Sequence, residues 1–228
     1  MSEFDIGAND LTIVDYSSPD MDLARIAQDI GHTSWVYRLA DRSEDEISRV
    51  FDPGNEDSAR LLYDRMSSKI GKFASAVCVF DNDPIGYCWA NEDVGNIPKP
   101  IQMTKTMLGK ITGKEPYVWI AQINVLPAYW NKGIGSLLLK STLEKFKDTR
   151  KVSTYVFDEN MPTLEWFGKL GFYPKPAYAI DPNKNDPNGP DYYFGEGAKH
   201  IHQWRLEHQS VGSLLRSLGN RLQNFKKD

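Results

Sequence analysis

Two closely spaced glycines, Gly133 and Gly135, lie in a short turn between an apolar stretch and an apolar-rich segment. The stretch from Tyr117 to Val125 predicts a buried strand, and the segment after the turn predicts a helix. Glycines let the backbone bend tightly and let a ligand approach the peptide groups closely. The first turn of a helix also has unpaired N–H groups and a partial positive charge. This turn is therefore predicted to bind an anion such as pyrophosphate.

The spacing of these glycines excludes two common nucleotide-binding motifs. The dinucleotide fingerprint GxGxxG is absent, and so is the phosphate loop GxxxxGK[ST], because no lysine follows a glycine at the required spacing. Taken alone, the glycine pair is equally compatible with a plain strand-to-helix turn that binds nothing.

The residues around the glycines are more specific. The segment INVLPAYWNKGIGSLLL resembles the acyl-CoA-binding motif of the GNAT superfamily of N-acyltransferases, whose usual form is [QR]xxGx[GA] after a strand that ends in Val. Trp130 stands where the family has Gln or Arg, while the glycines and Lys132 are in place. A second block, KVSTYVFDENMPTLEWFGKLGF, is similar to the family's strand, Asn and helix ending in Y-x-K-x-G-F. Together the two blocks cover residues 117–173.

This resemblance implies a fold and a domain organisation. The fold class would be α+β, with a mixed and mostly antiparallel twisted sheet flanked by helices. Residues 1–206 would form the N-acetyltransferase domain, and residues 207–228 would add an amphipathic C-terminal helix.

The resemblance also implies an activity. The chain would transfer an acetyl group from acetyl-CoA to a primary amine by direct attack in a ternary complex, without a metal. Backbone N–H groups of the strand would bind the thioester carbonyl, the pantetheine arm would lie along the strand, and the pyrophosphate would rest on the turn. The residues expected to contact coenzyme A are Ile123, Asn124, Val125, Trp130, Asn131, Lys132, Gly133, Ile134, Gly135, Ser136, Asn160 and Phe167.

The acid and base of many family members have no counterpart at the usual positions. The strand contains no Glu, and its polar side chains are Gln122 and Asn124. Phe167 replaces the tyrosine of the Y-x-K-x-G-F pattern and has no proton to donate. The expected catalytic group of the strand is the backbone of Val125, and the candidates for proton transfer are Glu92, Asp93, Asp158, Glu159 and Tyr173. The missing groups leave an alternative open: a catalytically inactive, CoA-binding sensor or interaction module on the same fold.

Composition limits the classes of partner. The 228-residue chain has a formal net charge of −4, which argues against nucleic-acid binding and is compatible with a cationic small-molecule or peptide amine. No apolar run approaches the ~20 residues that span a membrane. The two cysteines, Cys78 and Cys88, are predicted to lie on opposite faces of a hairpin and to form no disulfide, which fits a cytoplasmic location.

Periodicity predicts the remaining elements. The sequence predicts a first strand, three helices after it and a hairpin around a Asp-Asn-Asp-Pro turn. The predicted strands are Leu11 to Tyr16, the hairpin strands Phe73 to Phe80 and Ile85 to Ala90, and the last strands Tyr173 to Ile180 and His200 to Leu206. The predicted helices are Met21 to Ile30, a helix that begins with Ser43 and Glu46 as a capping box, and a helix through Leu61 to Met66.

Three further segments have open roles. Residues 92–115 form either a lid over the active site or a surface decoration, and the aromatics Tyr192, Tyr193 and Phe194 either line the acceptor pocket or pin their loop. His200 and His202 are too few to predict a metal site. The apolar stripe from Val211 to Phe225 predicts a helix that packs on its own domain or on a second subunit, with a membrane surface as the less favoured alternative.

Overall fold

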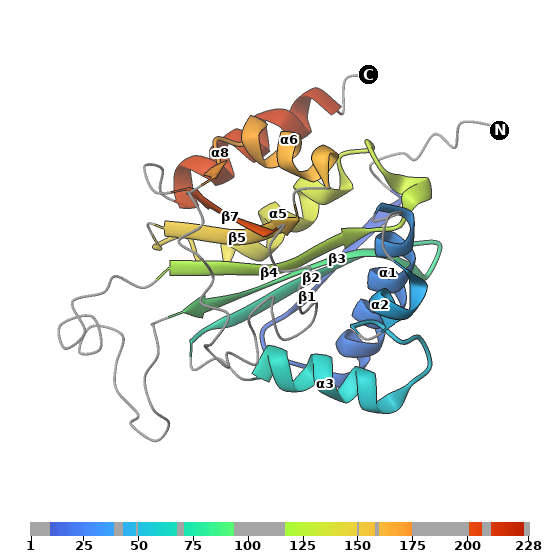
Figure 1. Cartoon of the computed structure of the whole chain (residues 1–228). Coiled ribbons are helices and arrows are strands. Elements are labelled where there is room, and N and C mark those ends of the chain that lie inside the picture. Colours follow the sequence, from blue (N-terminus) through green and yellow to red (C-terminus); the bar gives the residue numbers. More distant parts are fainter. Residues whose placement is uncertain are drawn as a thin grey trace.

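The described residues form a seven-stranded mixed sheet (Figure 1). The computed structural model describes residues 10–38, 43–48, 50–67, 71–93, 117–149, 151–157, 160–174, 201–206 and 211–225. The strand order is β1-β2-β3-β4-β5-β7-β6, and β4 and β5 are the one parallel pair of neighbours in this sheet. The predicted mixed, mostly antiparallel sheet is therefore confirmed. The strands are β1 (Leu11–Tyr16), β2 (Phe73–Phe80), β3 (Asp83–Asp93), β4 (Tyr117–Val125), β5 (Lys151–Phe157), β6 (Tyr173–Pro174) and β7 (Ile201–Leu206).

Helices cover both faces of the sheet, so the molecule has three layers (Figure 1). On one face lie α1 (Met21–Arg38), α2 (Glu44–Ser48) and α3 (Glu56–Ser67), and on the other lie α5 (Ile134–Glu144), α6 (Met161–Lys169) and α8 (Val211–Phe225). A short 3-10 helix, η1 (Pro127–Tyr129), connects β4 to the turn before α5. The largest buried cluster lies between the sheet and the helices α5, α6 and α8. The glycine turn thus connects the central strand β4 to α5, a helix of the layer that covers the main core.

Helix α1 is longer than predicted. The sequence pattern placed its end at Ile30, but the helix continues to Arg38. Gly31 interrupts the apolar periodicity, yet it lies inside the helix where the ring of Phe51 packs against it. A Cβ atom at this position would come within 2.4 Å of that ring. The glycine therefore allows a close approach rather than ending the helix, and the extra turns carry Arg38 to Asn160 and Thr163 at the start of α6.

The hairpin of β2 and β3 forms around the predicted turn. Asp81 and Asn82 both have positive φ values, 52° and 68°, as the central residues of a two-residue hairpin turn with the favoured twist require. Strand β3 begins at Asp83 and continues to Asp93, so it is longer than the predicted segment at both ends. Its length allows β3 to pair with all of β4.

The predicted arrangement of the cysteines is wrong, although both are free. Cys88 pairs with Ala76, and Cys78 is two residues further along the same strand. Because side chains alternate with a period of two, Cys78 and Cys88 point to the same face, where both are fully buried in the main core cluster. The error came from fixing the register of the hairpin by its turn alone, because the register shifts between Cys78 and Val79.

Both thiols are expected to be unreactive in the folded protein. Burial raises the pKa of Cys78 to about 11 and that of Cys88 to about 12. At pH 8 the folded chain should therefore consume no thiol reagent such as DTNB on the timescale of mixing, and should react at both cysteines once denatured. Fast modification of either thiol before unfolding would contradict this burial.

The C-terminal helix α8 packs on its own domain. Val211, Leu214 and Leu218 are fully buried and belong to the same cluster as Leu138 and Leu143 of α5. The predicted amphipathic helix is confirmed, and the part of its apolar stripe formed by Val211, Leu214 and Leu218 is covered by the helix's own domain. Among the described helices, none is long and apolar enough to cross a membrane.

Several predicted features fall outside the described residues. These are the segment 94–116 with its candidate lid, the segment 175–200 with its aromatic residues and His200, and the candidate acids Asp158 and Glu159. The backbones of Tyr173 and His202 lie in β6 and β7, but their side chains are not described.

Candidate functional site

Strands β4 and β5 separate halfway along β4. Their parallel pairing extends from Tyr117 opposite Lys151 to Ile120 opposite Thr154, whereas β3 pairs with β4 as far as Val125. The second half of β4 therefore has one edge that β5 does not cover. A bulge at Ala121 marks the point of separation, because Trp89 and Ala90 of β3 lie opposite Gln122 and Ile120.

The open edge of β4 carries backbone N–H groups. The N–H of Leu126 donates to Ile85 of β3 at 2.9 Å. Because successive N–H groups of a strand point to opposite sides, those of Ile123 and Val125 point away from β3, toward the edge that β5 has left. This geometry provides two donors at one side of the gap, two residues or about 7 Å apart along the strand.

The glycine turn joins this edge to the N-terminus of α5. Asn131 and Gly133 both have positive φ values, 61° and 74°, which fold the chain back within a few residues. Gly133 is the N-cap of α5 and offers no side-chain cap. The described residues supply no acceptor to the N–H groups of the first helical turn, Ile134 to Ser136, and such groups bind anions at other helix N-termini.

Trp130, the residue that departs from the family motif, has a structural role in the turn. Its indole N–H donates to the carbonyl of Val125 at 2.6 Å, which fixes the turn to the end of β4. The guanidinium of Arg38, from the end of α1, lies over the indole ring at 4.1 Å from its centroid. Tyr37 contacts the same ring edge-on, with 5.1 Å between centroids. The indole thus supports a cation that comes from another element.

A cavity of about 500 Å³ opens between β4, the glycine turn, α6 and α8. Two of its described lining residues, Arg38 and Arg221, are basic and none is acidic. The lining residues that the sequence predicted to contact coenzyme A are Ile123, Val125, Trp130, Asn131, Gly133, Ile134, Gly135 and Ser136. The remaining walls are Arg38, Tyr129, Pro162, Thr163, Trp166 and Arg221. The cavity therefore combines a helix N-terminus with two guanidinium groups.

Arg38 is a largely buried cation whose described partners are all neutral. Its guanidinium donates to the Oδ1 of Asn160 at 3.4 Å and to the hydroxyl of Thr163, both at the start of α6. Burial lowers the pKa of Arg38, which means that the charged form is disfavoured by its surroundings. Buried charges in proteins are normally paired, so a cation placed this way in a cavity points to an anionic ligand.

The other face of β4 carries a directed hydrogen-bond network. The indole N–H of Trp89 and the hydroxyl of Tyr87 both donate to the Oε1 of Gln122, at 3.1 and 2.8 Å. The Nδ2 of Asn124 donates to Tyr87 at 2.8 Å, and Trp35 donates to the Oδ1 of Asn124 at 3.1 Å. Because an indole N–H can only donate, the two tryptophans fix which way both amides point. The two polar side chains of the strand are thus used in packing, and neither is a base.

Removing the central hydroxyl of this network should destabilise the fold. Tyr87 is fully buried, so Tyr87→Phe leaves the Nδ2 of Asn124 without its acceptor in a dry environment. We expect a loss of about 1 to 3 kcal/mol in the free energy of unfolding, measured by urea denaturation. Tyr37→Phe is the matched control, because Tyr37 is 67% exposed, and it should change stability by less than about 0.5 kcal/mol. Equal stabilities of the two variants would show that the network contributes nothing.

Four predicted contact residues lie outside the cavity lining. Asn124 points into the network on the opposite face, and Lys132 lies half-buried in the turn without lining the cavity. Asn160 caps α6, where its Oδ1 accepts from the N–H of Thr163, and it touches the site through Arg38. Phe167 is 1% exposed, packed among core aromatics such as Phe172.

The structure does not bring Glu92 to the site. Glu92 is buried and pairs with Val118 near the start of β4. The cavity lies at the other end of that strand, at Ile123 and Val125, which is roughly 20 Å away at the usual rise per residue. We therefore remove Glu92 from the candidate proton-transfer groups. The remaining candidates, Asp158, Glu159 and the side chain of Tyr173, lie outside the described residues, and so does the side chain of Asp93.

The two cavity arginines were not identified from the sequence. Arg38 follows the predicted helix end by eight residues, and Arg221 was placed on the polar face of the terminal helix. The sequence did contain a signal for Arg38. Trp130 replaces the Gln or Arg of the motif, so a residue from elsewhere in the chain has to supply the polar side chain that the motif normally provides. No local signal distinguishes Arg221 from Arg216, which is exposed on the same helix.

Comparison with known proteins identifies the family. The family model described as the acetyltransferase (GNAT) family matches residues 37–172, which is more than half of the chain. This range contains the strand, the glycine turn and the Asn-capped helix. The chain therefore belongs to the GNAT family of acetyltransferases. A search of curated proteins finds no match.

Solved structures with the same fold are distant in sequence. The PaiA N-acetyltransferase from Thermoplasma acidophilum, determined in complex with coenzyme A, is 13% identical with a TM-score of 0.54, covering 87% of this chain and 99% of that one. PH1933 from Pyrococcus horikoshii OT3 is 13% identical with a TM-score of 0.52, covering 88% and 98%. At this level of sequence identity the likeness establishes the fold alone. The extra helix α8 packs on this fold.

Among the described residues, no group of three or more His, Cys, Asp or Glu side chains is placed to hold a metal ion.

Proposed function

We propose that the chain is an N-acetyltransferase that transfers the acetyl group of acetyl-CoA to a primary amine by direct attack in a ternary complex. The observation that carries the proposal is the cavity at the glycine turn, where a bare helix N-terminus faces the open edge of β4 beside Arg38, a cation whose described partners are all neutral. Family membership and a relative determined with coenzyme A support the same donor.

The geometry suggests how the donor is bound. The pyrophosphate would accept hydrogen bonds from the first turn of α5 and from Arg38, whose guanidinium forms charge-assisted bonds with phosphate oxygens. The pantetheine arm would pass Ile123 and Val125 in the gap between β4 and β5. The amides of the pantetheine arm would hydrogen-bond to the open edge of β4. This placement would bring the thioester to the N–H groups of Ile123 and Val125.

The chemistry then needs little from side chains. The neutral amine attacks the thioester carbonyl carbon, and the resulting oxyanion accepts a hydrogen bond from a backbone N–H of β4. The C–S bond breaks, the thiolate leaves and takes up a proton, and the amine nitrogen releases one. Holding amine and thioester in line supplies most of the rate gain, while proton transfer adds ~10² to 10⁴-fold. The backbones of Asp93 and Tyr173 lie at the level of Tyr117 and Trp119, the end of the sheet that excluded Glu92. Asp158 or Glu159, which follow β5 in the chain, is therefore the proposed source of that last factor.

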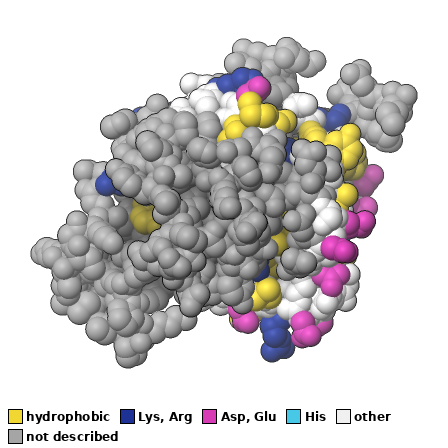
Figure 2. All heavy atoms as spheres, viewed as in Figure 1, with side chains coloured by type: hydrophobic (Ala, Val, Ile, Leu, Met, Phe, Trp, Pro, Cys, Tyr) yellow, Lys and Arg dark blue, Asp and Glu magenta, His cyan; other side chains and the backbone are white. Residues whose placement is uncertain are grey.

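The acceptor is proposed to be a cationic small molecule or peptide amine. Acidic side chains gather along the side of the molecule formed by α1, α2 and α3, where the acceptor is proposed to approach (Figure 2). The exposed members are Asp22, Asp29, Glu44, Asp45, Glu56, Asp57 and Asp64. Such a surface raises the local concentration of cations and disfavours nucleic acid.

A second candidate function is a CoA-binding sensor that has lost catalysis. The network on β4 favours it, because Gln122 and Asn124 are fixed amides where many family members carry a carboxylate. Phe167 is buried in the core and supplies no hydroxyl near the cavity. A sensor would bind the donor as tightly as an enzyme does.

Thiol release from acetyl-CoA separates the two functions. The purified chain is incubated with acetyl-CoA and a panel of polyamines, amino acids, aminoglycosides and peptides, and free CoA thiol is followed with DTNB. An N-acetyltransferase gives amine-dependent release that saturates with one class of amine. Donor binding without release for any amine would support the sensor and reject the enzyme.

A further inference from the structure

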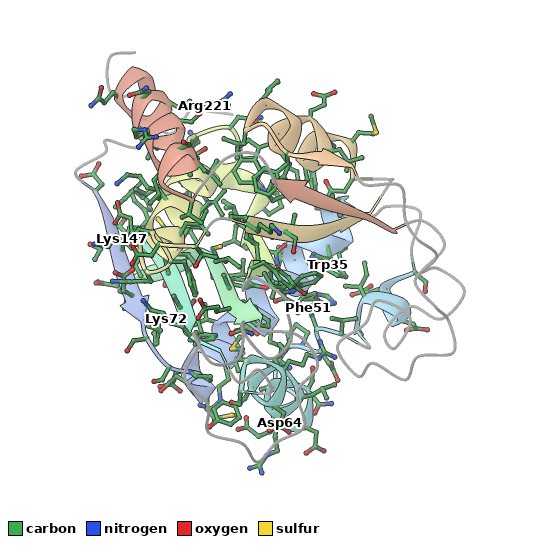
Figure 3. All side chains as sticks on the ribbon, turned by 90° about the vertical axis from the view of Figure 1, so that its left-hand side faces the viewer. Trp35, Phe51, Asp64, Lys72, Lys147 and Arg221 are labelled. Atoms are coloured by element: carbon green, nitrogen blue, oxygen red, sulfur yellow. The ribbon has the colours of Figure 1, made fainter. Side chains whose placement is uncertain are left out.

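Arg221 brings a second guanidinium to the cavity from outside the family-matched residues. The match ends at residue 172, and Arg221 belongs to the C-terminal helix α8. Its Nη2 donates to the carbonyl of Lys169 at the end of α6, at 2.5 Å. Figure 3 shows Arg221 beside α8, on the side that faces α6. Among the described residues this is its one hydrogen bond, and a guanidinium has five N–H donors, so others can serve a ligand.

The packing of α8 explains why this residue reaches the cavity. The N–H of Val211 donates to Thr149, just beyond the C-terminal end of α5, so α8 begins there and runs back along α5. Arg221 lies ten residues after Val211, which is about 15 Å along a helix. The eleven residues of α5 span about the same length. Arg221 is thereby placed next to the N-terminus of α5, where the glycine turn is.

The order of groups in coenzyme A indicates which group lies in the part of the cavity next to Arg221. If the thioester lies at Ile123 and Val125 and the pyrophosphate lies on the turn, the adenosine continues past the turn. The cavity wall there consists of α6 residues, with Trp166 closest to Gly135, and of Arg221. The indole of Trp166 offers an apolar surface for a base, and a guanidinium binds a phosphate monoester with two parallel hydrogen bonds.

We propose that Arg221 binds the 3′-phosphate of coenzyme A, so that α8 makes the site selective for the 3′-phosphorylated donor. The inference rests on the proposed function, since it assumes that the cavity holds acyl-CoA. It gives the two arginines separate tasks: Arg38 faces the pyrophosphate, which every CoA derivative with an adenosine carries, and Arg221 faces the phosphate that 3′-dephospho-CoA lacks.

Titration calorimetry with two donors tests this division. Acetyl-CoA and acetyl-3′-dephospho-CoA are titrated into the wild type and into Arg221→Gln, Arg38→Gln and Arg216→Gln. Arg216 is the matched control, because it is exposed on the same helix and does not line the cavity. We expect the wild type to prefer acetyl-CoA by about tenfold, the order of one charge-assisted hydrogen bond. Arg221→Gln should weaken acetyl-CoA alone and remove the preference.

The remaining variants make the outcome unambiguous. Arg38→Gln should weaken both donors by the same factor and keep the preference, and Arg216→Gln should change neither. A wild type that binds both donors equally, or an Arg221→Gln variant that weakens both equally, would overturn the inference and leave the proposed function standing. A wild type that binds neither acetyl-CoA nor acetyl-3′-dephospho-CoA would reject the inference and the proposed function together. The melting temperature of each variant confirms that it is folded.

Discussion

Gly135→Glu should abolish acetyl-CoA binding without unfolding the chain. A side chain at this position would project beside Trp166, since an added Cβ meets the indole at 3.8 Å and both residues line the cavity. The carboxylate would enter the space proposed for the pyrophosphate and repel it. We expect affinity to fall by a factor on the order of 100 or more, equivalent to about 3 kcal/mol, measured by titration calorimetry.

Gly135→Ala is the control for this substitution. Its methyl group makes an ordinary contact with Trp166, and Gly135 does not have a positive φ. Alanine in a helix is more stable than glycine by up to about 1 kcal/mol, so the control should be folded and should bind within about threefold of the wild type. Gly133 is unsuitable for the experiment, because its φ of 74° would strain any other residue. Undiminished binding by Gly135→Glu would place the donor elsewhere.

Arg38→Gln should weaken donor binding while leaving the stability of the free protein nearly unchanged. Within the described part of the chain, the guanidinium bonds neutral groups, at Asn160 and Thr163, and burial disfavours its charge. Loss of these bonds is therefore offset by relief of desolvation, and the free energy of unfolding should change by less than about 1 kcal/mol. Without a cation opposite the pyrophosphate, affinity for acetyl-CoA should fall by about 10- to 100-fold.

Arg25→Gln is the matched control for Arg38→Gln. Arg25 lies on the same helix, but it is exposed, pairs with Asp22 and Glu56, and does not line the cavity. It should bind the donor as the wild type does. If Arg38→Gln instead lost stability by several kcal/mol and kept its affinity, Arg38 would be a structural link between α1 and α6 rather than a ligand for an anion.

The parts of the site that are contiguous in the sequence were predictable. The apolar run of β4, the turn and the first turn of α5 follow one another from Tyr117 to Ser136, so local pattern alone places them together. The antiparallel hairpin of β2 and β3 was predictable for the same reason, since its turn residues tolerate positive φ. In both cases the physical cause acts over a few neighbouring residues.

The parts that depend on register and packing were not predictable. Glu92 was a reasonable acid from its position after a strand, but β3 pairs with β4 from Gly86 to Asp93 and places Glu92 beside Val118, away from the cavity. Cys78 was misplaced because a register shift follows it. Arg38 reaches the cavity because Gly31 lets α1 continue past Phe51, a tertiary contact that no helical periodicity reports.

The most direct test of the account is a calorimetric titration of the wild-type chain with acetyl-CoA. A donor site built from the bare N-terminus of α5, the open edge of β4 and Arg38 predicts one site per chain with a dissociation constant on the order of micromolar, about −8 kcal/mol. A folded protein that releases no heat and binds no acetyl-CoA at millimolar concentration would contradict it, and the cavity would then require a different anion.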